Sequence, residues 1–125
     1  MSRGSALFIV TPSRMAVAER GLSVLAAHGL DADSGMAVLR AVTSFVHGAA
    51  QTEIALRDYQ ERHGWTSGEE TREALAPQMR HLMGTGRCPA FEQYALGASR
   101  KDDRAWEFAF GLDCVLDGIA QRLGI

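Results

Sequence analysis

The chain has 125 residues, and its 13 basic side chains are outnumbered by 15 acidic ones, which gives a formal net charge of −2. This balance, without any basic run, argues against binding to nucleic acid through bulk charge. The length fits a single folded domain over 1–125, and the 46% of hydrophobic residues is ordinary for a soluble globular protein.

The cysteines and the absence of long apolar segments bear on the location of the protein. Cys88 and Cys114 form neither a metal-ligand cluster nor a disulfide framework, which indicates a reduced environment. The apolar run near the N-terminus is too short for a signal peptide or a membrane span, and no other segment is longer. We therefore expect a cytoplasmic protein that does not contact a membrane.

The first helix is predicted over about Ser13 to His28. Pro12 suits a first helical turn, and Gly29 is a typical stop. Because no stretch alternates apolar and polar residues between hairpin turns, we expect an all-α fold throughout the chain. The inward face of this helix is expected to hold Val17, Gly21, Val24 and Leu25.

The longest helix is predicted over about Ala32 to Arg62, capped by Asp31 or Asp33, with a break near Ser34–Gly35. It carries two neighbouring apolar stripes, and an apolar surface this wide indicates burial on two sides. The first stripe comprises Val38, Val42, Phe45, Ala49 and Thr52, and the second comprises Leu39, Val46, Ala50 and Ile54.

A polar, glycine-containing connection leads to the next helix. Ser67 followed by Glu70 fits the capping box, in which each residue satisfies a free backbone N–H of the helix start. The helix itself is predicted over about Gly68 to Met83, where Pro77 predicts a kink or a late start. A short helix over 89–96 follows, beginning with a proline.

The last helix is predicted from Ser99 or Asp102 to about Leu123 and is apolar over most of its circumference. It carries two glycines, Gly111 and Gly118, and each costs a helix interior about 1 kcal/mol relative to alanine. Their presence suggests that something approaches this side closely. We expect a subunit interface there; the alternative is a helix buried wholly within one subunit.

The sequence gives only weak signals for a catalytic or metal-binding site. The four histidines lack the spacing of a zinc site. Asp113 and Asp117 lie one helical turn apart, as paired carboxylates would, but arginines such as Arg122 can neutralise them. Cys114 has no histidine at a diagnostic spacing and is expected to be a small hydrophobic residue. We therefore expect no enzymatic activity, no cofactor and no metal.

Two stretches resemble patterns of the TetR family of transcriptional regulators. "WEFAFGLDCVLDGI", residues 106–119, is similar to the family's final helix, where F-x-x-G-L-(D/E)-x-x-(L/I)-x-G recurs. "SFVHGAAQTE", residues 44–53, resembles the family's (S/H)-F-x-x-G-x-x-x-x-E segment. The two stretches stand in the expected order and separation, so the resemblance covers nearly the whole chain.

The resemblance implies an all-helical C-terminal domain that binds a small effector in its interior and dimerises. The dimer would be a four-helix bundle formed by the helix at about Met36–Arg57 and the last helix of both subunits. The interface residues would be His47, Gln51, Ile54, Trp106, Phe110, Gly111, Cys114 and Gly118. The ligand-binding residues would be Met15, Val42, Phe45, Val46, Ala49, Thr52, Met79, Met83 and Phe91, unless these side chains simply build a core.

The chain also departs from the family. Family members carry an N-terminal helix-turn-helix domain, and no three-helix basic segment precedes Ser13, so we expect no direct contact with nucleic acid. Thr52 falls where the tetracycline repressor has a glutamate that helps to recognise a magnesium-bound drug, so we expect no metal site.

The expected function is therefore the binding of an apolar or aromatic small molecule and homodimerisation in a TetR-like regulator. The main alternative is a free-standing protein that binds and sequesters a small molecule. Two further alternatives are an enzyme that uses the same pocket and a partner that pairs with a full-length relative.

Overall fold

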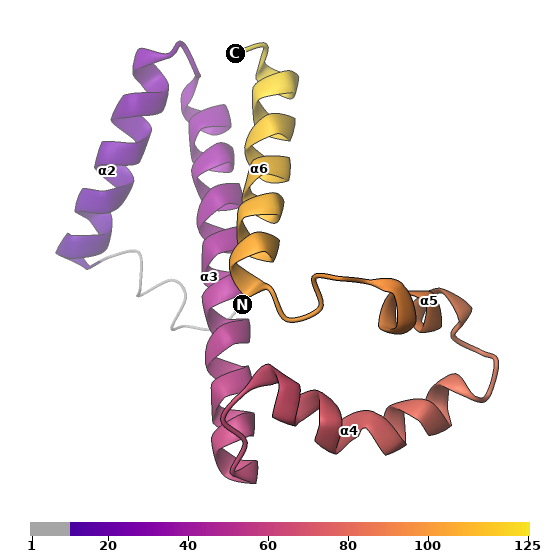
Figure 1. Cartoon of the computed structure of the whole chain (residues 1–125). Coiled ribbons are helices and arrows are strands. Elements are labelled where there is room, and N and C mark those ends of the chain that lie inside the picture. Colours follow the sequence, from indigo (N-terminus) through magenta and orange to yellow (C-terminus); the bar gives the residue numbers. More distant parts are fainter. Residues whose placement is uncertain (1–10) are drawn as a thin grey trace. The chain divides into compact units, whose positions relative to one another are not determined.

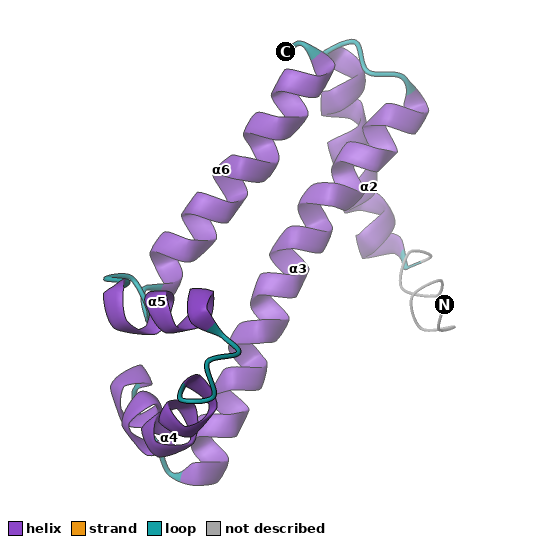
Figure 2. Cartoon of the chain, turned by 90° about the vertical axis from the view of Figure 1, so that its right-hand side faces the viewer, coloured by secondary structure: helices purple, strands orange, loops and turns teal. Residues whose placement is uncertain are grey.

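The computed structural model describes residues 11–125, which form five helices and no strand (Figure 2). The predicted all-α fold is thereby confirmed, while the N-terminal apolar run lies outside the described residues. The helices, labelled in Figure 1, are α2 (Pro12–Ala27), α3 (Ala32–His63), α4 (Gly68–Met83), α5 (Pro89–Gly97) and α6 (Arg104–Leu123).

The contacts between residues divide the chain into two compact units. The terminal unit comprises Met1–His47 and Leu112–Ile125, and the central unit comprises Gly48–Gly111. Helices α3 and α6 each contribute one part to each unit. The single domain expected over 1–125 stays a prediction.

In the terminal unit, α2 and the first half of α3 form a helical hairpin (Figure 1). The turn between them contains Gly29, whose φ of +88° is a left-handed conformation that glycine adopts without strain. The helices approach closely at Gly21, where an added Cβ would lie 2.8 Å from Cδ1 of Leu39. Glycine at this position lets α2 pack directly onto α3.

The inward face of α2 is rotated relative to the prediction. Gly21 and Leu25 are half-buried as expected, but the side chains of Val17 and Val24 are 53% and 58% exposed. The half-buried stripe instead includes Ala18 and Leu22, because the contact with α3 is centred on that side of the helix. The prediction for the two valines was wrong, because each lies one residue, or about 100° around the helix, away from a half-buried neighbour.

The predicted break near Ser34–Gly35 does not occur, since α3 is one continuous helix. The Asp31 carboxylate accepts a hydrogen bond from the backbone N–H of Ser34 at 2.7 Å, which satisfies a free donor of the first turn. Gly35 is buried, and a Cβ there would lie 3.5 Å from Cδ2 of Leu22. The glycine therefore marks a close contact with α2 and not an interruption of the helix.

The start of α4 in the central unit agrees with the predicted capping box. The hydroxyl of Ser67 accepts a hydrogen bond from the backbone N–H of Glu70 at 3.1 Å. The Glu70 carboxylate in turn accepts one from the backbone N–H of Thr66 at 2.8 Å, one residue earlier than in the standard motif. Helix α4 starts at Gly68 and continues through Pro77, so the predicted late start is wrong.

Helix α6 starts later than predicted, at Arg104. Asp103 occupies the capping position, because its carboxylate accepts a hydrogen bond from the backbone N–H of Trp106 at 3.1 Å. The same carboxylate binds the guanidinium of Arg100 at 2.8 Å. The segment from Ser99 to Asp102, predicted as the helix start, belongs to the connection from α5.

The burial of apolar side chains is low throughout the described residues, where no hydrophobic side chain is buried. The half-buried stripe of α6 in the terminal unit consists of Leu112, Val115, Ile119 and Leu123. Within residues 11–125, no helix combines the length and hydrophobicity that crossing a bilayer requires.

Candidate functional site

The residues predicted to bind a ligand are distributed over both units. In the terminal unit, Met15 lies on α2, and Val42, Phe45 and Val46 lie on α3. In the central unit, Ala49 and Thr52 lie on α3, Met79 and Met83 on α4, and Phe91 on α5. Among them, Met15 and Val46 are about half-exposed, at 52% and 42%. The set stays a prediction, because the arrangement within each unit does not test it.

The polar member of this set, Thr52, is already engaged. Its hydroxyl donates a hydrogen bond to the backbone carbonyl of Gly48 in the preceding turn, at 2.9 Å. A hydroxyl retains acceptor capacity after donating its proton, so Thr52 can still accept a hydrogen bond from a ligand. Thr43 is engaged in the same way, since its hydroxyl donates to the backbone carbonyl of Leu39 at 2.8 Å.

Apolar and aromatic side chains gather on α4 and α5. Met79 and Met83 are half-buried, whereas Leu82 on the same helix is 50% exposed. Phe91 and Tyr94 of α5 form a tilted aromatic pair with ring centroids 5.8 Å apart, and both rings remain exposed. Flexible methionines beside aromatic rings provide the kind of surface that adapts to an apolar ligand.

The residues predicted to form the dimer interface lie on surfaces of α3 and α6 that the chain leaves open. Ile54, Trp106 and Phe110 are 60%, 39% and 57% exposed. The other members are also exposed except Gly111, which is half-buried; they are His47, Gln51, Cys114 and Gly118. Large apolar side chains on a helix surface are a typical mark of an interaction site.

Gly118 has no close neighbour in the described chain. A Cβ added there would meet no heavy atom of the described residues within 4 Å, in contrast to Gly21. The packing of residues 11–125 therefore gives no reason for glycine at position 118. The same holds for Gly48 in the middle of α3.

One ion pair of Glu53 joins α3 to the start of α6 within the central unit, and a second lies within α3. The carboxylate of Glu53 lies 3.2 Å from the guanidinium of Arg104 and 3.6 Å from that of Arg57. Glu53 is also the glutamate of the "SFVHGAAQTE" stretch. No local pattern predicts its pairing with Arg104, because 51 residues separate the two.

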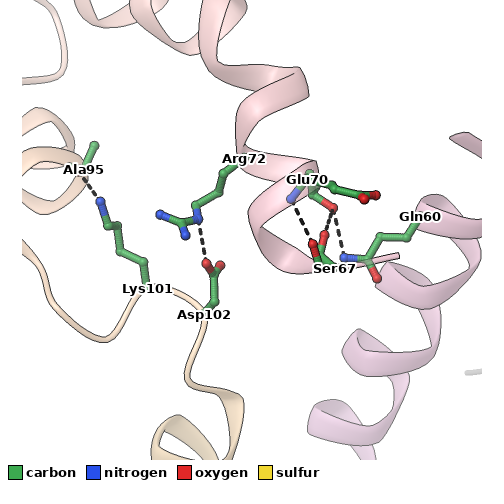
Figure 3. A network of polar contacts seen from close by, with 8 residues as sticks. Gln60, Ser67, Glu70, Arg72, Ala95, Lys101 and Asp102 are labelled. Carbon is green, nitrogen blue, oxygen red and sulfur yellow. Dashed lines mark hydrogen bonds and ion pairs between the residues drawn. The ribbon is translucent and has the colours of Figure 1, made fainter. Parts of the chain in front are cut away.

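A polar cleft of about 380 Å³ lies beside α4 and the connection from α5 to α6. It is lined by Arg72, Ser99, Lys101, Asp102 and Asp103. In Figure 3 the guanidinium of Arg72 extends from α4 to the Asp102 carboxylate, with Nε and Oδ2 2.6 Å apart. The Lys101 ammonium donates to the backbone carbonyl of Ala95 at 2.6 Å. Sequence reasoning missed this cleft, and the run of charges at 100–104 was its only signal.

The carboxylates of two helix starts have lowered pKa values. The backbone N–H of Ser34, followed by its hydroxyl, lowers the pKa of Asp31 below the usual 3.8. The backbone N–H of Trp106, followed by the side chain of Arg100, lowers the pKa of Asp103 in the same way. Both carboxylates therefore stay ionised at neutral pH and serve as caps, a role that differs from acid–base chemistry.

No group of three or more metal-binding side chains occurs within residues 11–125. Asp113, Asp117 and Cys114 are exposed on α6.

In a comparison with known proteins, residues 5–123 match the family model of the tetracyclin repressor-like C-terminal domain. The HTH-type transcriptional repressor DrrR1 of Streptomyces coeruleorubidus is 28% identical over 120 residues. That alignment covers 93% of this chain but 43% of the repressor, so the chain spans less than half the length of this relative. No solved structure matches the chain.

Proposed function

The chain belongs to the family of tetracyclin repressor-like C-terminal domains, and from this premise we propose that it binds a small-molecule effector and forms a homodimer through α3 and α6. The effector is an apolar or aromatic compound, and the dimer is a four-helix bundle of these two helices from both subunits. The protein acts in the cytoplasm as the sensing part of a TetR-like regulator. We assign the residues of this chain no direct contact with nucleic acid and no enzymatic role.

One observation carries the dimer proposal. No hydrophobic side chain of the described residues is buried, while large apolar side chains lie exposed on both proposed interface helices. On α6 these are Trp106, Phe108, Phe110 and Leu116, and on α3 they are Val46 and Ile54. Burial of apolar surface contributes about 25 cal/mol per Å², so a second subunit that covers these side chains stabilises the fold of both.

Gly118 supports the same proposal. It is exposed on α6, and an added Cβ would have no neighbour within 4 Å in the described chain. A glycine or other small residue at a helix crossing lets two backbones approach, and a twofold axis would bring the same residue from both subunits to the crossing. The cost of the glycine to helix stability is then offset in the dimer.

The effector proposal is supported by the side chains that the helices present. The ligand set consists mainly of apolar residues, with methionine and phenylalanine on three helices and Thr52 as a hydrogen-bonding group. The repressor relative acts on transcription according to its name. An effector would alter such a regulator only by binding one conformation of the dimer more tightly than another.

Native mass spectrometry of the protein, purified without added ligand, tests both parts. We expect a dimer, with a bound small molecule that is released on collisional activation. A bare monomer at micromolar concentration would contradict the interface on α3 and α6. A dimer without any bound molecule, and without binding of an apolar fluorescent probe such as anilinonaphthalene sulfonate, would contradict the effector part alone.

A further inference from the structure

The polar cleft beside α4 differs from the apolar surfaces discussed so far, because four of its five lining residues are charged. Its volume of about 380 Å³ lies within the range of small-molecule sites, roughly 300–1,000 Å³. All five lining residues belong to the central unit, so the cleft is formed within one compact part of the chain.

Both carboxylates of the cleft already form ion pairs with arginines. Asp102 pairs with Nε of Arg72 at 2.6 Å. Asp103 pairs with Arg100 at 2.8 Å and also accepts a hydrogen bond from the first turn of α6. The two acidic groups therefore have cationic partners of their own and leave the remaining cation of the cleft without compensation.

That remaining cation is Lys101. Its side chain is half-buried, and its ammonium is held by the neutral carbonyl of Ala95. Among the described residues, no carboxylate lies within ion-pair distance of the Lys101 nitrogen. An ammonium bound to one carbonyl retains further N–H groups, and a partly buried charge without a counter-ion attracts an anion.

The neighbouring groups add donors to the same cleft. Arg72 engages Asp102 through Nε, while most N–H groups of a guanidinium lie on its terminal nitrogens. Figure 3 shows this guanidinium reaching from α4 toward the connection that carries Lys101. The Ser99 hydroxyl also lines the cleft. Together with Arg100, the partner of Asp103, the cleft has three cations, the other two being Arg72 and Lys101. Its carboxylates are those of Asp102 and Asp103, so one positive charge is in excess.

We propose that this cleft binds a small anion, a carboxylate or phosphate group, between the Lys101 ammonium, the Arg72 guanidinium and the Ser99 hydroxyl. Charge-assisted hydrogen bonds from such donors are stronger than those between neutral groups. The anion would connect the first turns of α4 with the segment that leads into α6. None of these three donors belongs to the residues proposed for the effector site or for the dimer interface.

The test is an NMR titration of the 15N-labelled full chain with inorganic phosphate, and in a second arm with acetate, at constant ionic strength. We expect saturable shifts of the backbone amides of Arg72, Ser99 and Lys101. Saturation by both ions would assign the site to anions in general, and saturation by one of them would assign it to phosphate or carboxylate ligands. Shifts that rise linearly, without saturation, would overturn the proposal.

Variants make the test specific. Lys101 is the only lysine of the chain, so Lys101→Met removes the only side-chain ammonium and is expected to weaken binding about tenfold or more. Lys101→Arg should largely restore it. The matched control is Arg87→Gln, which removes an equal charge from an exposed residue outside the cleft. Equal losses in Lys101→Met and Arg87→Gln would indicate nonspecific attraction and contradict the site.

Loss of the Lys101 bond to Ala95 can disturb the connection before α6, so a milder variant is needed as well. Ser99→Ala removes one hydroxyl from an exposed position and should weaken binding by about threefold to tenfold. If Lys101→Met does not fold, an unchanged affinity of both Ser99→Ala and Arg72→Gln would overturn the proposal.

Discussion

The helices of the terminal unit meet at glycines, whereas the helices of the central unit are joined by charged and polar side chains. In the terminal unit, Leu39 and Leu22 of the helical hairpin reach the positions where Gly21 and Gly35 lack a side chain. In the central unit, Arg72 binds Asp102 (Figure 3). In the same unit, Arg104 binds Glu53, and Gln60 donates to the hydroxyl of Thr71 at 3.0 Å.

This difference has consequences for what each unit needs from its surroundings. Polar contacts are directional, and those that join Arg72 to Asp102 and Arg104 to Glu53 form within one chain. Apolar packing at glycines orders two helices but leaves other faces open, such as that of Val17 and Val24 on α2. In the proposed dimer, a second subunit covers exposed faces of α3 and α6.

The largest expected effect is that of Gly118→Leu on the proposed dimer. The variant inserts a side chain at the helix crossing of both subunits, and overpacking of this kind costs about 1–3 kcal/mol per site. The dissociation constant of the dimer should therefore rise by tenfold or more, as measured by sedimentation velocity across a concentration series.

The control for this variant is Ala109→Leu, which adds a similar side chain to α6 at an exposed position half a turn away in helical phase. It should leave the dimer intact. The interface would be misassigned if Gly118→Leu sedimented like the unmodified protein, or if both variants weakened the dimer equally.

Gly21→Val tests the apolar packing of the terminal unit. Because a Cβ at this position already lies 2.8 Å from Cδ1 of Leu39, a branched side chain must push the helices apart. We expect the free energy of unfolding to fall by about 1–3 kcal/mol in urea titrations. Gly21→Ala should cost less, since the end of the Leu39 side chain can rotate away; a stability equal to that of the unmodified protein in Gly21→Val would show that α2 does not pack this closely.

Ser67→Ala tests the polar connections of the central unit. The variant removes the acceptor for the backbone N–H of Glu70, and loss of such a cap costs about 1 kcal/mol. Thermal unfolding followed by circular dichroism should detect the change. Ser13→Ala, in the first turn of α2 where Thr11 holds the capping position, is the matched control and should have almost no effect.

The smallest expected effect is a loss of stability in acid through Asp31 and Asp103, one in each unit. Both pKa values are lowered in the folded state, so the stabilisation is present above the usual pKa of 3.8 and is lost as the pH falls below it. Asparagine also caps helices but does not titrate in this range.

Asp31→Asn and Asp103→Asn should therefore show a smaller decrease of the melting temperature between neutral pH and about pH 3 than the unmodified protein. Asp117→Asn, an exposed position inside α6, is the control and should follow the unmodified protein. An identical acid sensitivity of all these proteins would mean that the two caps do not contribute.

Local sequence patterns predicted much of the fold. Helical periodicity, Pro12 and Gly29 around α2, and the Ser67–Glu70 capping box led to the correct set of helices, because these signals act within a few residues. The resemblance of the "WEFAFGLDCVLDGI" and "SFVHGAAQTE" stretches predicted the family that the match over residues 5–123 confirms.

Errors arose where a local signal had two meanings. Gly35 suggested a helix break, but in the structure it is a contact point for Leu22 of the neighbouring helix. Ser99 and Asp102 can both cap a helix, yet Asp103 does so. Val17 and Val24 were assigned to the inward face because apolar periodicity does not specify which flank of a wide stripe meets α3.

By itself, the sequence determined the helical class, the helix ends with capping signals, and the family, since these depend on local patterns. Only the tertiary structure decided which side of α2 packs on α3, that Glu53 pairs with Arg104, and that Lys101 lines a cleft without a carboxylate partner. Such contacts join residues far apart in the chain, and their geometry depends on how whole helices pack, which no local pattern of residues encodes.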